Sequence, residues 1–89
     1  MPDCELTIPN EEGLHARPAA KFVKMASQFS SEIWVEKDDE EINGKSIMGL
    51  MMLAAAQGSI IRVTAEGDDA EDAIAKITVL VNSGFEADC

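Results

Sequence analysis

The sequence predicts an α+β fold in which helices cover one face of a sheet and leave the other face open to water. Segments that alternate apolar and polar residues interleave with segments whose apolar residues recur at helical spacing, in the order β-α-β-β-α-β-α. The chain has 89 residues, which suffices for one domain over residues 1–89 with one hydrophobic core. Helices packed against one sheet face then form two layers.

The first half of the chain predicts a strand, a helix and a hairpin. Residues 4–8 alternate apolar and polar side chains and stop at Pro9, as in a half-buried strand followed by a loop. Between residues 16 and 29, apolar side chains recur three and four positions apart, which indicates a helix. Residues 32–36 alternate again, and the acidic run at residues 38–41 suits a solvated hairpin turn.

The hairpin is expected to return in a short strand at residues 41–43, followed by another helix and another strand. Ser46 occupies the N-cap position of a helix over residues 47–54, which we expect Gly58 to close. Residues 60–66 then form the fourth strand.

The last predicted element is an amphipathic helix over residues 70–81. Asp68 and Asp69 precede it, so we expect a carboxylate to cap its first turn. Gly84 is placed to end it.

Composition excludes several classes of function. A formal net charge of −10 argues against nucleic acid, because a phosphate backbone repels an acidic surface. No stretch approaches the ~18 consecutive apolar residues of a membrane helix, and no basic region leads into an apolar run at the N-terminus, so we expect a cytoplasmic protein without membrane insertion. Cys4 and Cys89 form no CxxC pair and there is a single histidine, which predicts reduced thiols and no metal site.

Residues 13–18, Gly-Leu-His-Ala-Arg-Pro, carry the most chemical information. Pro18 suits the first turn of a helix, where its missing N–H would have had no partner. A residue that precedes proline resists helical angles, so the N-cap is His15, Ala16 or Arg17. In each case the free amides and the positive end of the helix dipole converge near His15, where they favour an anion.

His15 and Arg17 together suit the transfer of a phosphoryl group. A neutral imidazole nitrogen is a nucleophile, and with an unperturbed pKa of ~6.5 most of it is neutral near pH 7. Arg17 can bind phosphate oxygens in bidentate fashion, and the helix amides spread the charge during in-line transfer. Taken alone, the position of His15 also suits a histidine that merely caps a helix.

The hexapeptide Leu-His-Ala-Arg-Pro-Ala at residues 14–19, together with the predicted order of elements, resembles the family of the histidine-containing phosphocarrier protein HPr across essentially the whole chain. The resemblance implies an HPr-like open-faced β-sandwich, with three helices on one face of a four-stranded antiparallel sheet. It also implies that His15 is the phosphoacceptor, Arg17 the phosphate-stabilising cation and Pro18 the helix-start residue. The backbone of Ala16 joins Arg17 as the expected phosphate-binding group.

The same resemblance implies the partners and the kind of activity. The donor is enzyme I of the bacterial phosphotransferase system, phosphorylated from phosphoenolpyruvate, and the acceptors are IIA domains of sugar permeases. The chain is then a carrier that forms a transient phosphohistidine during sugar uptake, and not an enzyme. No cofactor is implied, and we expect a monomer.

Residues 44–51, Gly-Lys-Ser-Ile-Met-Gly-Leu-Met, resemble the regulatory site of the family, where HPr kinase/phosphorylase phosphorylates a serine from ATP. Ser46 matches that serine, and its predicted N-cap role is by itself worth ~1 kcal/mol. A phosphoserine adds about −1.5 to −2 charges, which a helix N-terminus tolerates but an acidic partner does not. Modification of Ser46 is therefore expected to weaken docking of enzyme I without a change at His15.

Apolar side chains after Ser46 are candidates for partner docking. Ile47, Met48 and Met51 belong to a helix with more flexible apolar side chains than one buried face can use, so some must face solvent.

Basic side chains are the second set of docking candidates. Lys21, Lys24 and Lys45, with Arg17, are expected near His15, where they can steer acidic partners; the alternative is an ordinary solvated helix surface.

Ser27 departs from the family, in which a basic residue is common at this position. Electrostatic attraction is therefore expected to be weaker, and more of the contact with partners apolar.

Two other functions remain open at this point. An acyl carrier protein is also small and acidic, with a modified serine at a helix start, but it is all-helical and would have an aspartate in place of Lys45. A regulatory phosphocarrier of the nitrogen-related branch is a nearer alternative, because residues 82–85, Asn-Ser-Gly-Phe, are similar to that branch. Residues 45–49 are more similar to the sugar-linked kind.

Overall fold

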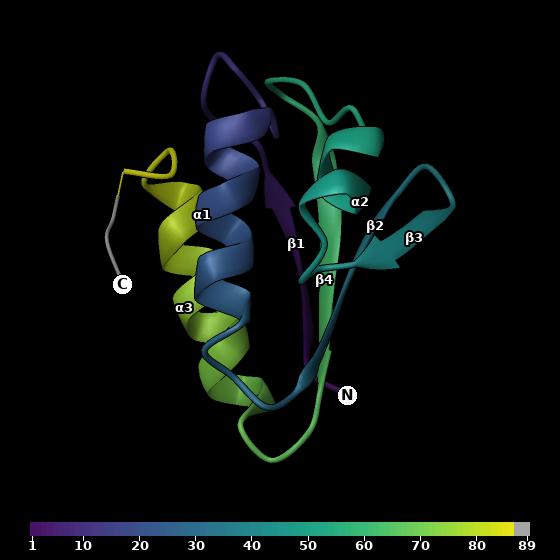
Figure 1. The fold of residues 1–89 in the computed structure, drawn as a ribbon, viewed down its shortest axis with the longest axis vertical. Coiled ribbons are helices and arrows are strands. Elements are labelled where there is room, and N and C mark those ends of the chain that lie inside the picture. Colours follow the sequence, from purple (N-terminus) through teal and green to yellow (C-terminus); the bar gives the residue numbers. More distant parts are fainter. Residues whose placement is uncertain (87–89) are drawn as a thin grey trace.

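Strands and helices alternate along the chain in the predicted order in a computed structural model, which describes residues 1–86 (Figure 1). The elements are β1 (Asp3–Thr7), α1 (Ala16–Ala26), β2 (Glu32–Lys37), β3 (Glu40–Asn43), α2 (Ile47–Met52), β4 (Ile60–Glu66) and α3 (Ala70–Asn82). The four-stranded sheet excludes the all-helical alternative. Within residues 1–86, no helix has the length and apolar character that a membrane crossing requires.

All strand pairs are antiparallel, and the strand order across the sheet is β1-β4-β2-β3. In the centre of the sheet, Val63 of β4 pairs with Cys4 on one side and with Val35 on the other. Of the strand residues that point toward the helices, Val35 and Val63 are buried and Cys4 is half-buried. Glu5 and Arg62, which neighbour each other on the opposite face, are exposed. The predicted covered and open faces are therefore confirmed.

Helices α1 and α3 lie side by side and run in opposite directions, so α3 ends beside the start of α1 (Figure 1). Helix α2 packs on the other side of α1. Phe22 of α1, Leu50 of α2 and Ile77 of α3 have no exposed surface, and each contributes roughly 1.5–3 kcal/mol by burial. This shared core fixes the three helices relative to the sheet.

Two helices end earlier than predicted. Helix α1 ends at Ala26 instead of Phe29, because the next residues form a turn in which the Ser27 N–H still donates to the carbonyl of Val23 at 2.8 Å. Helix α2 ends at Met52, and the expectation that Gly58 closes it is wrong.

The reversal after α2 occurs at Ala54, which takes a left-handed φ of 53°. Leu53, the residue before it, is 5% exposed and packs into the core. Gly58 lies in the later turn that leads into β4.

The end of α3 follows the prediction for Gly84, although the helix reaches Asn82. Gly84 takes a left-handed φ of 72°, and the N–H of Phe85 donates to the carbonyl of Leu80 at 2.9 Å. This glycine-terminated cap satisfies carbonyls at the helix end and folds Phe85 back into the core, where it is 3% exposed.

At the start of α3, the predicted carboxylate cap is wrong. Asp69 occupies the N-cap position, but its side chain makes no capping hydrogen bond. It accepts instead from the backbone N–H of Ser30 at 2.9 Å and of Ser31 at 3.0 Å, and from both serine hydroxyls. Asp69 thereby ties the start of α3 to the connection between α1 and β2. These hydrogen bonds lower the pKa of Asp69 from 3.8 to about 2, and the hydrogen bond from the Ser31 hydroxyl has the largest effect.

The lowered pKa of Asp69 predicts a loss of folding stability in acid. Because its folded-state pKa lies below its unfolded value, its contribution is present above pH ~4 and is lost as the pH falls toward 2. Urea denaturation at pH 7 and at pH 2.5 should therefore show a smaller difference between wild type and Asp69→Ala at the lower pH. The exposed neighbour Asp68 provides the control: Asp68→Ala should keep the pH dependence of wild type. A difference between wild type and Asp69→Ala that does not change with pH would contradict this role.

Candidate functional site

Helix α1 begins at Ala16, with His15 as its N-cap. The sequence left three candidates for the N-cap of this helix, and the structure identifies the first of them, His15. His15 has extended backbone angles, φ −84° and ψ −169°, and its carbonyl accepts from the N–H of Ala19 at 2.8 Å. Pro18 lies buried within the first turn, where its missing N–H leaves no donor unpaired.

The first turn of α1 has two backbone donors without a protein acceptor. Within residues 1–86, the N–H groups of Ala16 and Arg17 make no hydrogen bond. They lie at the positive end of an eleven-residue helix dipole, which favours an anion. The arrangement can therefore hold the oxygens of a phosphoryl group beside the N-cap.

The His15 side chain is exposed and does not cap α1. Its imidazole makes no hydrogen bond or ion pair with any residue in the described part of the chain. A histidine whose purpose is to cap the helix would donate or accept there. Both ring nitrogens are instead available to another molecule.

The backbone before His15 is fixed by the loop that joins α2 to β4. Leu14 is buried, and its N–H donates to the carbonyl of Ala55 at 2.8 Å. Gly13 has a φ of 68°, and a Cβ built there would lie 2.3 Å from the same carbonyl oxygen. The side-chain amide of Asn10 donates to the carbonyl of Gly13 at 3.0 Å. Two loops far apart in the sequence thus hold His15 at the start of the helix.

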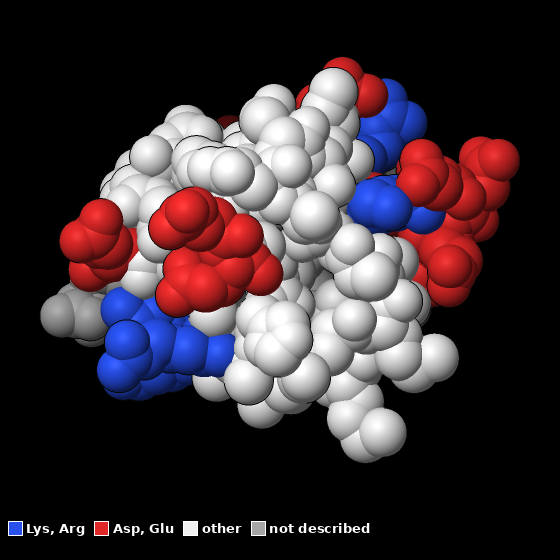
Figure 2. Space-filling view, turned by 90° about the horizontal axis from the view of Figure 1, so that it is seen from above, with Lys and Arg blue, Asp and Glu red and all other residues white. Residues whose placement is uncertain are grey.

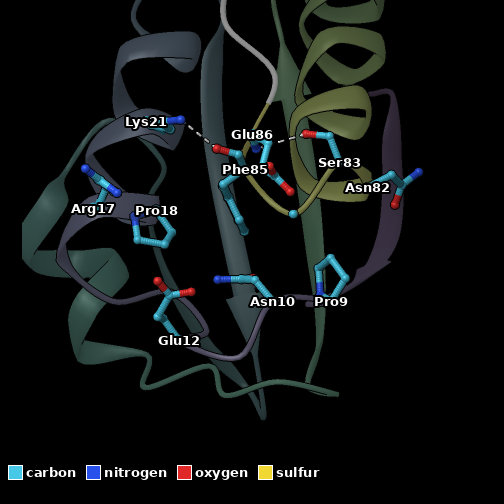
Figure 3. A pocket seen from close by; sticks show the side chains of 11 residues that line it. Pro9, Asn10, Glu12, Arg17, Pro18, Lys21, Asn82, Ser83, Phe85 and Glu86 are labelled. Carbon is cyan, nitrogen blue, oxygen red and sulfur yellow. Dashed lines mark hydrogen bonds between the residues drawn. The ribbon is translucent and has the colours of Figure 1, made fainter.

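Arg17 is exposed and lies at the edge of a hollow of about 480 Å³ between the start of α1 and the end of α3 (Figure 3). Within residues 1–86 its guanidinium has no carboxylate within 4.0 Å. The hollow is lined by Pro9, Asn10, Glu12, Arg17, Pro18, Lys21 and residues 82–86. Sequence reasoning selected only Arg17, Pro18 and Lys21 from this set, since nothing in the local pattern indicates that residues 82–86 return to α1.

The basic residues do not form the single cluster that was expected near His15. Lys21 lies one turn beyond Arg17 and donates to the carbonyl of Phe85 at 2.8 Å, which ties the C-terminal loop to α1 (Figure 3). Lys24 lies in the last turn of α1, at the opposite end from His15.

Lys45 likewise lies away from His15. It donates to the carbonyl of Phe29 at 2.8 Å, beyond the end of α1. Because α1 is about 16 Å long, Lys45 is distant from the N-cap. Figure 2, seen from above the start of α1, shows Lys and Arg side chains in separate groups on two sides of the view, with Asp and Glu side chains next to each group and an uncharged surface between them.

Ser46 is the N-cap of α2, as predicted, and its hydroxyl oxygen accepts from the N–H of Gly49 at 3.0 Å. The apolar candidates that follow are exposed: Ile47 by 42%, Met48 by 75% and Met51 by 39%. Met52, at 70%, extends this surface. Leu50 lies in the core, so α2 is anchored by one side and presents flexible apolar side chains on the other.

Cys4 is the cysteine that lies within the described residues. Cys4 is a half-buried free thiol, 3.6 Å from the hydroxyl oxygen of Thr78. Cys89 lies outside the described residues. Within residues 1–86, no group of three or more His, Cys, Asp or Glu side chains is arranged to hold a metal ion.

Comparison with known proteins identifies the family. A model described as the PTS HPr component phosphorylation site matches residues 3–83. The phosphocarrier protein HPr of Neisseria meningitidis serogroup A is 52% identical over 80 residues, which cover 90% of each chain. The HPr-like protein Crh of Halalkalibacterium halodurans is 43% identical over 81 residues, which cover 91% of this chain and 96% of that protein.

Solved structures agree with the sequence relationship. The crystal structure of HPr-C-His from Thermoanaerobacter tengcongensis superposes with a TM-score of 0.94 at 50% identity, and the match covers 100% of both chains. The α+β fold with three helices and a four-stranded antiparallel sheet is therefore that of solved HPr structures.

Gly13 and Gly58 provide a test of the bracing before His15. Both have left-handed φ values, 68° and 88°, so a side chain costs about 1–2 kcal/mol of strain at either position. Only at Gly13 does a Cβ also collide with backbone atoms, whereas at Gly58 nothing lies within 4 Å. Gly13→Ala should lower the free energy of unfolding measured in urea by at least about 1 kcal/mol more than Gly58→Ala. Equal losses would mean that the contact between Gly13 and Ala55 is not tight.

Proposed function

This chain belongs to the HPr family of phosphocarrier proteins of the phosphotransferase system, and on that premise we propose that it accepts a phosphoryl group on His15 and passes it to another protein. The observation that carries the proposal is an exposed imidazole, without a protein partner in residues 1–86, at the N-terminus of α1. The unpaired N–H groups of Ala16 and Arg17 support it.

The proposed transfer uses only groups of this chain and of the donor. The lone pair of a neutral ring nitrogen of His15 attacks phosphorus, the new P–N bond forms, and the bond to the donor atom breaks with its electron pair going to the donor. The other ring nitrogen keeps its proton, so the phosphorylated ring is cationic until that proton leaves. Meanwhile the amides of Ala16 and Arg17 and the guanidinium of Arg17 balance the charge on the oxygens.

We further infer that enzyme I is the donor and that IIA domains of sugar permeases are the acceptors. The exposed side chains of Ile47, Met48 and Met51 suit partners of different shapes, because methionine adapts readily to its contacts. Lys24 is exposed and suits the rim of such an interface, where it would steer acidic partners. Lys21 and Lys45 each donate to a backbone carbonyl, so their contribution to docking is expected to be smaller.

Ser46 is the proposed site of regulation by HPr kinase/phosphorylase. Its half-buried hydroxyl already caps α2, and a phosphate there would remain near the positive end of the helix. It would also place about two negative charges beside Ile47 and Met48, in the proposed docking surface. Repulsion of an acidic partner then follows without any change at His15.

The phosphoacceptor is tested by labelling from phosphoenolpyruvate and enzyme I. Wild type should acquire an acid-labile phosphoryl group that His15→Ala abolishes, and Arg17→Ala should slow labelling by at least about tenfold, through loss of one charge-assisted contact. Lys76→Ala, an exposed cation on α3 away from the site, is the control and should label at the wild-type rate. Equal labelling of wild type and His15→Ala would end the assignment.

Regulation is tested with ATP and HPr kinase. Wild type should acquire an acid-stable label that is absent from Ser46→Ala and unchanged in Ser59→Ala. The modified protein should then accept phosphoryl groups from enzyme I more slowly than unmodified protein, and the deficit should shrink in high salt because charge repulsion is screened. Label on Ser46→Ala, or an unchanged rate after modification, would contradict this role.

A further inference from the structure

The hollow beside Arg17 contains carboxylates that the proposed transfer does not use. Four charged side chains line it: Glu12, Arg17, Lys21 and Glu86. Lys21 is committed to the carbonyl of Phe85. No ion pair within 4.0 Å among the described residues includes Arg17, Glu12 or Glu86. The guanidinium of Arg17 can therefore bind either a nearby carboxylate or another anion.

Glu12 is the carboxylate in the loop that leads directly into His15. Figure 3 shows the Glu12 and Arg17 side chains at one wall of the hollow, on either side of Pro18. Glu12 is exposed, so its side chain can move toward the guanidinium. Glu11, its neighbour, carries the same charge and is also exposed, but it does not line the hollow.

We propose that Glu12 competes with the phosphoryl group for the Arg17 guanidinium and so favours release of the group from His15. The inference rests on the proposed function of His15. When the P–N bond forms, Arg17 turns to the phosphoryl oxygens and is no longer available to the Glu12 carboxylate. When the P–N bond breaks and the electron pair returns to the ring nitrogen, Arg17 is again available to Glu12. Glu12 therefore stabilises the unphosphorylated carrier, and it is a positioning residue that acts through Arg17.

The expected effect is modest because both side chains are exposed. Exposed ion pairs shift equilibria by roughly two- to fivefold, and salt screens them over about 8–10 Å at physiological ionic strength. Removing the Glu12 carboxylate should therefore increase the phosphorylated fraction of the carrier by this factor at low salt. The increase should diminish as the salt concentration rises.

The test measures the phosphotransfer equilibrium between enzyme I and the carrier, with a limiting amount of phosphoenolpyruvate in low salt. Wild type is compared with Glu12→Gln, Glu12→Asp and Glu11→Gln, and the ratio of phosphorylated to free carrier is determined for each. Glu12→Gln should raise this ratio roughly two- to fivefold, whereas Glu12→Asp, which keeps the carboxylate, should stay near wild type. Glu11→Gln should change the ratio by less than half as much.

A second comparison, in an Arg17→Ala background, tests the route of the effect. There Glu12→Gln should leave the ratio unchanged, because the guanidinium for which Glu12 competes is gone. Equal shifts for Glu12→Gln and Glu11→Gln, or a shift that persists without Arg17, would overturn the proposal in favour of a general charge effect. No shift in a carrier that still labels at His15 would overturn this inference alone, whereas failure of wild type to label would remove the proposed function as well.

Discussion

The function proposed for this protein depends on one constraint: α1 must begin at Ala16, so that two backbone N–H groups remain unpaired beside an exposed imidazole. Pro18 removes a third donor from the same turn and fixes its own backbone angle. A helix that began one turn earlier would pair these amides internally and place His15 on a helical surface. The anion site is therefore a property of where the helix starts, more than of any single side chain.

The rest of the fold determines that starting point. Leu14 is held by the carbonyl of Ala55, and Gly13 allows the close approach of the two loops. The loops themselves extend from strands β1 and β4, which pair in the sheet. On the opposite side, Lys21 binds the carbonyl of Phe85 and encloses the hollow beside Arg17. These contacts fix the loops around the start of α1. The fixed loops leave the N–H groups of Ala16 and Arg17 unpaired at the surface.

Several roles that depend on neighbours in the chain could be predicted from the sequence, although the end of α2 could not, because Ala54 and not Gly58 makes the reversal. Roles that depend on distant residues were missed. The cap at Ser46 and the termination at Gly84 follow from local hydrogen bonding, and both were predicted correctly. Asp69 was expected to cap α3, but its partner Ser31 lies 38 positions away and no local pattern indicates it. Lys45 was expected near His15, because sequence alone does not show which end of α1 the start of α2 contacts. The hollow escaped prediction for the same reason, since it forms only when the end of α3 returns to α1.

The most direct measurement of the central claim is a comparison of backbone amide NMR spectra before and after phosphorylation by enzyme I. If the first turn of α1 holds the phosphoryl oxygens, the N–H signals of Ala16 and Arg17 should show the largest downfield proton shifts in the protein, as expected for new charge-assisted hydrogen bonds. Unchanged signals from these two amides in a carrier phosphorylated on His15 would contradict the account.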